Sequence, residues 1–331
     1  MVLVPSALLA QGGFTGAESC RKCHASEFAR HAATGHADAL STVSSHPLAA
    51  SFMPAAPLTR DGYVFEFLKR ADLRVRISDR AQTVEEPLEW AFGAGEQAVT
   101  FVSRVNGEFH LEHYWSYYPA IGKMAPTPGQ DALRPKSLAE APGLLYKSTD
   151  PESGILGCFE CHSTGPVAAK PRIAPSQPGV WCEACHGPGA MHAKTASKDD
   201  IRNPGRLNAG ELNTMCGRCH RPPASDPAKI DWNYAWNVRH QPVYLSQSAC
   251  FEKSNGRLTC LTCHAAHEPL EHRPAVYNTK CTVCHLQQPR ACATNCIDCH
   301  MPRVVPQAPL RFTNHLIGVY GDGAKLRPRI R

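Results

Sequence analysis

The motif Cys-x-x-Cys-His occurs seven times in this chain of 331 residues, and no other feature constrains its fold as strongly. The copies use 14 of the 16 cysteines and 7 of the 17 histidines. Chance alone predicts about 0.04 copies in a chain of this composition. In chain order, motifs 1 to 7 are Cys20, Cys23, His24; Cys158, Cys161, His162; Cys182, Cys185, His186; Cys216, Cys219, His220; Cys260, Cys263, His264; Cys281, Cys284, His285; and Cys296, Cys299, His300. The chain has to fold around whatever these thiols and imidazoles bind.

This spacing is the attachment signature of c-type haem. The two thiols form thioether bonds to the vinyl groups of one porphyrin, and the adjacent histidine ligates the iron. Covalent attachment lets a short chain hold many haems without a large pocket for each. We therefore expect seven haem c groups, attached through the fourteen motif cysteines and ligated by the seven motif histidines.

Zinc is the main alternative, because Cys-x-x-Cys pairs also build zinc ribbons and knuckles. A zinc site does not require a histidine directly after every second cysteine. A disulfide framework also leaves the histidines unexplained, and a thioredoxin-like site needs one Cys-x-x-Cys on a βαβ unit rather than seven. Haem is the interpretation that accounts for all three motif positions.

Three stretches resemble the multihaem cytochromes c, in particular the group related to cytochrome c-554, octahaem hydroxylamine oxidoreductase and pentahaem nitrite reductase. They are SCRKCHASEFARHAATGHADAL at motif 1, GVWCEACHGPGAMHA at motif 3, and CLTCHAAHEPL with NCIDCHMPR at motifs 5 and 7. The resemblance covers roughly residues 18–42 and 150–318. It implies a haem-packed architecture, but reactions differ within the group, so it does not assign an activity.

The expected fold is mainly α with much irregular loop, a haem-packed multihaem cytochrome c architecture with a small antiparallel β insertion. Residues 1–14 are interpreted as the remnant of a secretion signal or as an N-terminal arm, because residues 1–10 are apolar and end in a small residue. Residues 15–50 should form a first haem-binding segment with a helix over 25–41, 51–150 a β-rich insertion, and 151–331 a six-haem domain. In that domain we expect short helices joined by proline-rich loops around a core of porphyrin.

The stretch 60–120 contains no cysteine and carries strand patterns. From Leu73 to Ile77 apolar and charged residues alternate, as in a half-exposed strand. Asn106-Gly107 separates two further runs and is a strong signal for a hairpin. The residues expected on one face of the second run are Phe109, Leu111, His113, Trp115 and Tyr117, with Glu108, His110 and Glu112 on the other.

Each iron has a second axial position, and ten histidines lie outside the motifs, which is enough to fill all seven with an imidazole. The resemblance implies distal ligands at His36, His192, His267 and His315, each often serving a haem other than that of the nearest motif. A second histidine gives an inert six-coordinate electron carrier, whereas an open position permits substrate binding. Because histidines are in excess, we expect bis-histidine coordination throughout.

Other histidines compete for the remaining axial positions. His113 is a candidate because a histidine on an apolar strand face needs a partner, and either iron or a backbone hydrogen bond would serve. His46 and His240 are included in the predicted ligand set, with His31 and His272 as competitors. The methionines considered are Met124, Met191 and Met215, any of which would raise the potential of its haem.

Two cysteines, Cys250 and Cys292, remain outside the motifs. They are even in number and flank haem motifs, so a disulfide between them is one hypothesis and two free thiols the other. In bacteria, c-type haem is attached outside the cytoplasmic membrane, so we expect a periplasmic or extracellular protein. No apolar run approaches the ~20 residues of a membrane span.

The formal charge of +6 does not indicate nucleic-acid binding. Seven haems would add about 14 negative charges through their propionates, and much of the arginine and lysine would neutralise these groups. No basic cluster with interleaved aromatic residues occurs. The expected partners are redox proteins, other multihaem cytochromes or further copies of the chain.

Two functions fit these features. The first is electron transport along closely spaced haems between redox partners, and it is compatible with stacking of subunits into an extracellular filament. The second is an oxidoreductase acting on a small nitrogen or sulfur compound at an open haem. Nitrite-reductase-like enzymes often carry Cys-x-x-Cys-Lys, and the hydroxylamine-oxidising subunit has eight haems. This chain has neither Cys-x-x-Cys-Lys nor an eighth motif, so electron transfer without turnover is favoured.

Overall fold

The structure is a computed structural model that describes residues 13–105, 108–148, 154–169, 173–222, 226–285 and 295–329. The chain divides into two compact units, Met1–Arg202 and Asn203–Arg331. The first unit contains motifs 1 to 3, and the second contains motifs 4 to 7. The first unit thus includes motifs 2 and 3, which the expected segments group with the later motifs.

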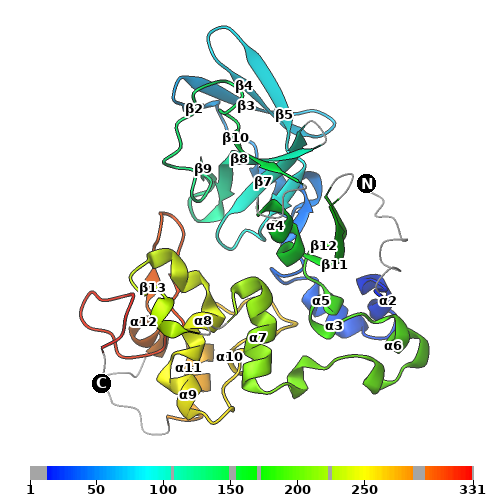
Figure 1. Ribbon diagram of the computed structural model, residues 1–331, viewed down its shortest axis with the longest axis vertical. Coiled ribbons are helices and arrows are strands. Elements are labelled where there is room, and N and C mark those ends of the chain that lie inside the picture. The colour runs from blue at the N-terminus through cyan, green and yellow to red at the C-terminus, as the bar shows by residue number, and fades with distance from the viewer. Residues whose placement is uncertain are drawn as a thin grey trace. The chain divides into compact units, whose positions relative to one another are not determined.

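Two antiparallel sheets form most of the first unit (Figure 1). The six-stranded sheet has the order β1 (Leu40–Thr42), β6 (Trp90–Phe92), β7 (Val99–Val105), β8 (Phe109–Tyr118) and β10 (Gly143–Lys147), and β9 (Lys123–Pro126) also pairs with β8. The four-stranded sheet has the order β2 (Leu58–Arg60), β3 (Tyr63–Lys69), β4 (Leu73–Ser78) and β5 (Thr83–Pro87). The expected hairpin is confirmed by the pairing of Val105 with Phe109, although 106–107 lie outside the described residues.

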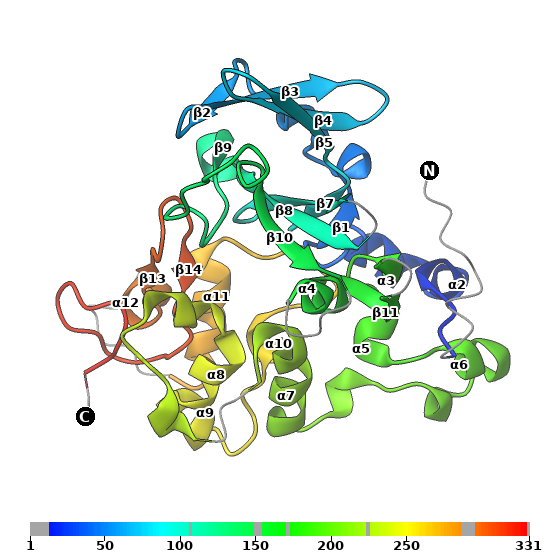
Figure 2. The same cartoon turned by 45° about the horizontal axis from the view of Figure 1, so that its top comes forward.

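The two sheets pack face to face over an apolar core, and Figure 2 shows the four-stranded sheet lying over the other. Phe65 and Ile77 of the four-stranded sheet meet Phe101 of the six-stranded sheet in this core. Phe65 also contacts Trp115 edge to face, with ring centres 5.8 Å apart. The alternation predicted for Leu73 to Ile77 is confirmed, because Val75 and Ile77 are buried in β4.

The other face of the six-stranded sheet is also buried, because helix α4 (Ile155–His162) lies against it. Trp90 and Phe92 point to this side and pack on Phe159 of α4. The face of β8 expected to be polar is therefore not solvated: His110 is 1% exposed and its ring lies 5.7 Å from that of Phe159. Since α4 carries motif 2, the sheet serves as the platform for one predicted haem site.

Short helices and a small hairpin complete the first unit. They are α2 (Ala17–Arg21), α3 (Ala25–His31), β11 (Ser163–Ala168), β12 (Ala174–Pro178), α5 (Cys182–His186) and α6 (Ala190–Thr195). The helix expected over 25–41 ends at His31, and a turn follows in which the hydroxyl of Thr34 accepts the amide N–H of Ala37.

The second unit is built from short helices with little apolar core. They are α7 (Ala209–His220), α8 (Gln241–Ser246), α9 (Ala249–Lys253), α10 (Cys260–Cys263), α11 (Pro274–Thr282) and α12 (Cys296–His300), with a two-stranded pairing of β13 (Arg303–Val304) and β14 (Phe312–Thr313). Helix α7 begins at a capping box, in which Asn208 and Glu211 exchange side-chain to backbone hydrogen bonds of 2.9 Å. Its last turn delivers motif 4.

The expectation of a mainly α chain is confirmed only in part. The second unit is helical, but the first is dominated by the ten described strands of its two stacked sheets, which are not one small insertion. Among the described helices, none is long and apolar enough to cross a bilayer.

Candidate haem-binding sites

The motifs lie on short helical turns, which bring their two cysteines to the same side. Residues three apart are neighbours on a helix surface, as thioether bonds to one porphyrin require. Motifs 2, 3 and 7 lie within α4, α5 and α12, and motif 4 ends α7. Backbone bonds from His24 to Cys20 and from His264 to Cys260 close the same turn at motifs 1 and 5. Every motif cysteine is at least partly exposed, so each thiol is accessible for attachment.

Several motif histidines are already oriented as metal ligands. The Nδ1 atoms of His162, His186 and His300 lie 2.8, 2.9 and 2.9 Å from the carbonyl oxygens of Ala39, Arg202 and Gly318. An imidazole that donates Nδ1–H to a backbone carbonyl keeps Nε2 free for metal and is held in a fixed orientation. These contacts therefore suit histidines that ligate through Nε2.

Two motif histidines face a second histidine across a gap that fits an iron atom. The ring centres of His24 and His192 are 6.2 Å apart, and so are those of His264 and His315. With metal–imidazole bonds of about 2.0–2.1 Å, ring centres on opposite sides of one metal lie about 6 Å apart. The rings are inclined by 23° and 36°. The geometry thus accommodates a bis-histidine iron at motif 1 and another at motif 5.

Both predicted distal histidines of these pairs are oriented by the backbone. Nδ1 of His192 lies 2.7 Å from the carbonyl oxygen of Ser197, and Nδ1 of His315 lies 3.0 Å from that of Thr313. Desolvation, with a smaller contribution from the neighbouring His264, lowers the pKa of His315 to about 4. The neutral imidazole, which is the form that binds metal, therefore predominates at neutral pH.

Thiols of different motifs also meet. Cys20 of motif 1 shares a hydrogen bond with Cys182 of motif 3, which raises the pKa of the Cys20 thiol and lowers that of Cys182 to about 7. Cys216 of motif 4 contacts Cys260 of motif 5 in the same way. Porphyrins attached to these sulfur atoms would lie side by side, so each unit contains one especially close pair of haem sites.

Comparison with known proteins also points to cytochromes. Residues 139–187, which contain motifs 2 and 3, match the sequence family described as cytochrome c554 and c-prime. The outer cell wall cytochrome OcwA is similar in fold, with a TM-score of 0.52 at 16% sequence identity over 92% of this chain and 79% of that one. The undecahaem cytochrome from the S-layer of Carboxydothermus ferrireducens gives a TM-score of 0.47 at 17% identity over 90% and 52% of the two chains.

This chain has the fold of a multihaem c-type cytochrome. Its sequence motifs and its paired histidines agree with that fold, and the resemblance found in the sequence is confirmed. The family match also spans the segment that joins β10 to motif 3, where the sheet of the cytochrome meets its haem-binding helices.

Two predicted distal ligands are otherwise engaged in the cytochrome. Nε2 of His46 lies 2.9 Å from the carbonyl oxygen of Gly93, and Nδ1 accepts the amide N–H of Leu48. Nε2 of His113 lies 2.7 Å from the hydroxyl of Ser103, which itself donates to the carbonyl of Pro87. Both histidines are buried within the β-rich part. Both are better described as core histidines with hydrogen-bond partners, and we omit both from the proposed ligand set.

Replacing His113 with glutamine should make the free energy of unfolding less sensitive to acid. Burial lowers the pKa of His113 to about 3, whereas an unfolded histidine titrates near 6.5. The unfolded state therefore binds the additional proton, so the stability contributed by neutral His113 is complete above about pH 6.5 and falls as the pH decreases toward 3. The loss approaches about 1.4 kcal/mol per pH unit.

Denaturant unfolding of wild type and His113→Gln at about pH 7 and about pH 5 measures this difference. Glutamine retains an N–H group for Ser103 but does not titrate. Equal losses of stability in the two proteins would contradict the prediction.

The other predicted distal ligands lie on loops beside helical motifs. His36 is exposed in the turn after α3, and His267 is half-buried just after α10. His240 lies between a 3-10 turn and α8, at a cavity of about 320 Å³ that Arg221 and Tyr244 also line. These three histidines remain predicted ligands.

The cysteine pair outside the motifs is only partly visible, because Cys292 is outside the described residues. Burial, with a smaller contribution from Cys284, raises the pKa of the Cys250 thiol. Cys250 thus lies close to motif 6, and its disulfide with Cys292 stays a prediction.

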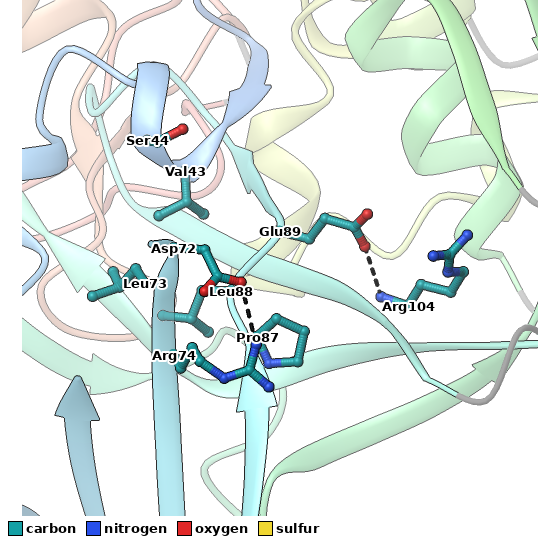
Figure 3. Close-up of a pocket in the computed structure, with 9 residues that line it drawn as sticks. All are labelled: Val43, Ser44, Asp72, Leu73, Arg74, Pro87, Leu88, Glu89 and Arg104. Carbon is teal, nitrogen blue, oxygen red and sulfur yellow. Dashed lines mark hydrogen bonds and ion pairs between the residues drawn. The ribbon is translucent and has the colours of Figure 1, made fainter. Parts of the chain in front are cut away.

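A cavity in the first unit is not a haem site by its lining. It measures about 300 Å³ and lies between the edges of the two sheets, where Figure 3 shows Arg74 paired with Asp72 and the Arg104 amide donating to Glu89. None of its lining residues belongs to a motif.

Glu183, inside motif 3, is a buried carboxylate that the sequence patterns do not single out as a candidate functional residue. A weak signal was present, because Gly187 and Gly189 follow it closely and glycine permits close approach of the backbone. A β-carbon at Gly189 would lie 3.2 Å from the Glu183 carboxylate.

Proposed function

We propose that this cytochrome transfers electrons between redox partners along seven covalently attached haem c groups, without turning over a substrate. The observation that carries the proposal is the pair of histidine couples, His24 with His192 and His264 with His315, each at 6.2 Å. An iron held between two imidazoles has no open position for a substrate, so its chemistry is limited to gain and loss of an electron.

Bound haem would supply the one-electron chemistry, and the residues of this chain would set its spacing and potential. In the first unit, the contact of Cys20 with Cys182 favours close coupling of the haems on motifs 1 and 3. Backbone contacts link His162 of motif 2 to Ala39 and Gly179, near the same region. These contacts support a compact group of three haems.

The motifs of the second unit adjoin one another in chain order. Cys216 contacts Cys260, which supports close haems on motifs 4 and 5. The ring of Tyr277 on α11 lies 5.9 Å from that of His264, so motif 6 lies beside motif 5. The side chain of Asn278 accepts the amide N–H of Cys296 at 3.0 Å and ties motif 7 to the same helix. This order supports electron transfer from motif 4 to motif 7 or the reverse.

Export to the periplasm or the cell exterior belongs to this proposal. Its support is the haem chemistry and the fold shared with a cytochrome named for the outer cell wall. The predicted leader at 1–14 lies almost wholly outside the described residues. Partners would be redox proteins or other multihaem cytochromes, and polymerisation into a filament remains a prediction.

Mass spectrometry and electron paramagnetic resonance of the natively purified protein test the proposal. The mass should exceed that of the polypeptide by seven haems, and the ferric spectrum should contain only low-spin signals. A Cys158→Ser, Cys161→Ser double variant should carry six haems, and its mass gives the change expected from the loss of one haem. A high-spin ferric signal in the wild type would support the alternative, an oxidoreductase with an open haem, and would overturn turnover-free electron transfer.

A further inference from the structure

The carboxylate of Glu183 joins three segments of the first unit. Oε1 accepts the amide N–H of Thr15 at 2.9 Å and that of Gly189 at 2.7 Å, and Oε2 accepts the amide N–H of Gly16 at 2.8 Å. Glu183 is only 3% exposed. All three contacts are N–H groups that donate to a carboxylate oxygen, and such charge-assisted hydrogen bonds are stronger than those between neutral groups.

Two of the three segments carry groups needed at the first haem site, and the third carries the attachment cysteines of haem 3. Gly16 precedes α2, which holds Cys20 of motif 1, and Gly189 precedes α6, which supplies His192. Glu183 itself lies in α5 next to Cys182 of motif 3. One side chain therefore connects the attachment helix of haem 1, the helix of its distal ligand and the attachment helix of haem 3.

The charge of Glu183 also lies near both sulfur atoms of this pair. Its proximity contributes to the raised pKa of the Cys20 thiol, after the Cys182 hydrogen bond and burial. Within the described residues, no lysine or arginine forms an ion pair with it. Ferric haem carries one more positive charge than ferrous haem, so a nearby unneutralised anion favours the ferric form and lowers the reduction potential.

We infer that Glu183 is a positioning residue that holds the His192 helix against motif 1, and that its buried charge keeps the haems on motifs 1 and 3 at low reduction potential. The inference rests on the proposed ligation of haem 1 by His24 and His192. One carboxylate would then lower the reduction potentials of both haems of this pair. Electrons would leave this pair readily toward haems of higher potential.

The test needs one haem that can be recognised in a redox titration. His192→Met provides it, because methionine in place of an axial histidine raises the potential of that haem alone. Glu183→Gln is then added to this marked protein. Glutamine can keep the Oε1 contacts, but it removes the charge and places an N–H group against the amide of Gly16.

The expected result is a further rise in the potential of the marked haem. Glu18→Gln is the matched control, because Glu18 lies on α2 beside motif 1 with a side chain 73% exposed. The rise with Glu183→Gln should be at least about threefold that with Glu18→Gln, since water and salt screen an exposed charge far more than a buried one. Shifts of equal size would overturn the inference.

Glu183→Asp separates position from charge and covers the case in which the glutamine variant does not fold. Aspartate keeps the anion but is one methylene shorter, so the distal helix should loosen and a high-spin fraction should appear, while the fraction that stays low-spin should retain its potential. A raised potential of the low-spin fraction, or no high-spin fraction, would overturn the inference. If His192→Met alone shifts the potential of no haem, the proposed ligation by His192 is wrong, and the inference about Glu183 is wrong with it. If His192→Met shifts one haem but Glu183→Gln shifts it no further than the control does, only the inference about Glu183 is wrong.

Discussion

Replacing His192 with alanine should convert one haem of the cytochrome from low-spin to high-spin. His192 faces His24 with ring centres 6.2 Å apart, and its Nδ1 is held by the carbonyl of Ser197. Without this imidazole the iron on motif 1 would keep one protein ligand and bind water or added ligands at its open position. This is the largest functional change expected from a single substitution outside the motifs.

Electron paramagnetic resonance of the ferric protein measures the conversion, and one of seven haems should give the high-spin signal. His46→Gln is the control, because glutamine retains a donor to the carbonyl of Gly93 and His46 is not in the proposed ligand set. Its spectrum should remain low-spin. A high-spin haem in His46→Gln, with none in His192→Ala, would reverse the two assignments.

Replacing Phe159 with alanine should lower the free energy of unfolding by about 3–5 kcal/mol. Phe159 is fully buried at the centre of motif 2 and contacts the rings of Trp90, Phe92 and His110 edge to face. Alanine would leave a cavity between α4 and the six-stranded sheet, and the rigid surrounding strands cannot close it. The same substitution should loosen haem 2, because His162 packs on Phe92 at 5.4 Å.

Denaturant unfolding followed by circular dichroism measures this loss. Glu160→Ala is the matched control, since it changes the next residue of the same helix at an exposed position and should alter the free energy by less than about 0.5 kcal/mol. A loss below about 1 kcal/mol for Phe159→Ala would mean that α4 is not anchored through this ring.

Local pattern was a reliable guide where local chemistry controls the structure. The motif spacing predicts the helical turns at motifs 1 to 7, because two cysteines must reach one porphyrin. The alternation in β4 and the Asn106-Gly107 signal predict strands and a hairpin that the structure contains. The sequence pattern did not predict the extent of the β-rich part. It does not show that α4 covers the second face of the sheet, so that residues on both faces of β8 are buried.

At the candidate sites, too, the sequence does not show which distant residues come into contact. The resemblance implied His192 and His315 as distal ligands, but only the fold pairs them with His24 and His264. For His113 the sequence leaves iron and a hydrogen-bond partner equally open, and the structure places Ser103 beside its ring. The two glycines after Glu183 are too weak a signal to identify it, because its three partners come from a segment at the N-terminus and from the loop after its own motif.

The sequence by itself determined the chemistry of this cytochrome, since covalent attachment depends on residues that are neighbours in the chain. Cysteine spacing and the following histidine define each predicted haem wherever the motif occurs. Only the tertiary structure decided which histidines lie opposite one another, which motifs lie in contact and which buried carboxylate lies beside them. Those properties depend on contacts between segments far apart in sequence, and packing alone brings such segments together.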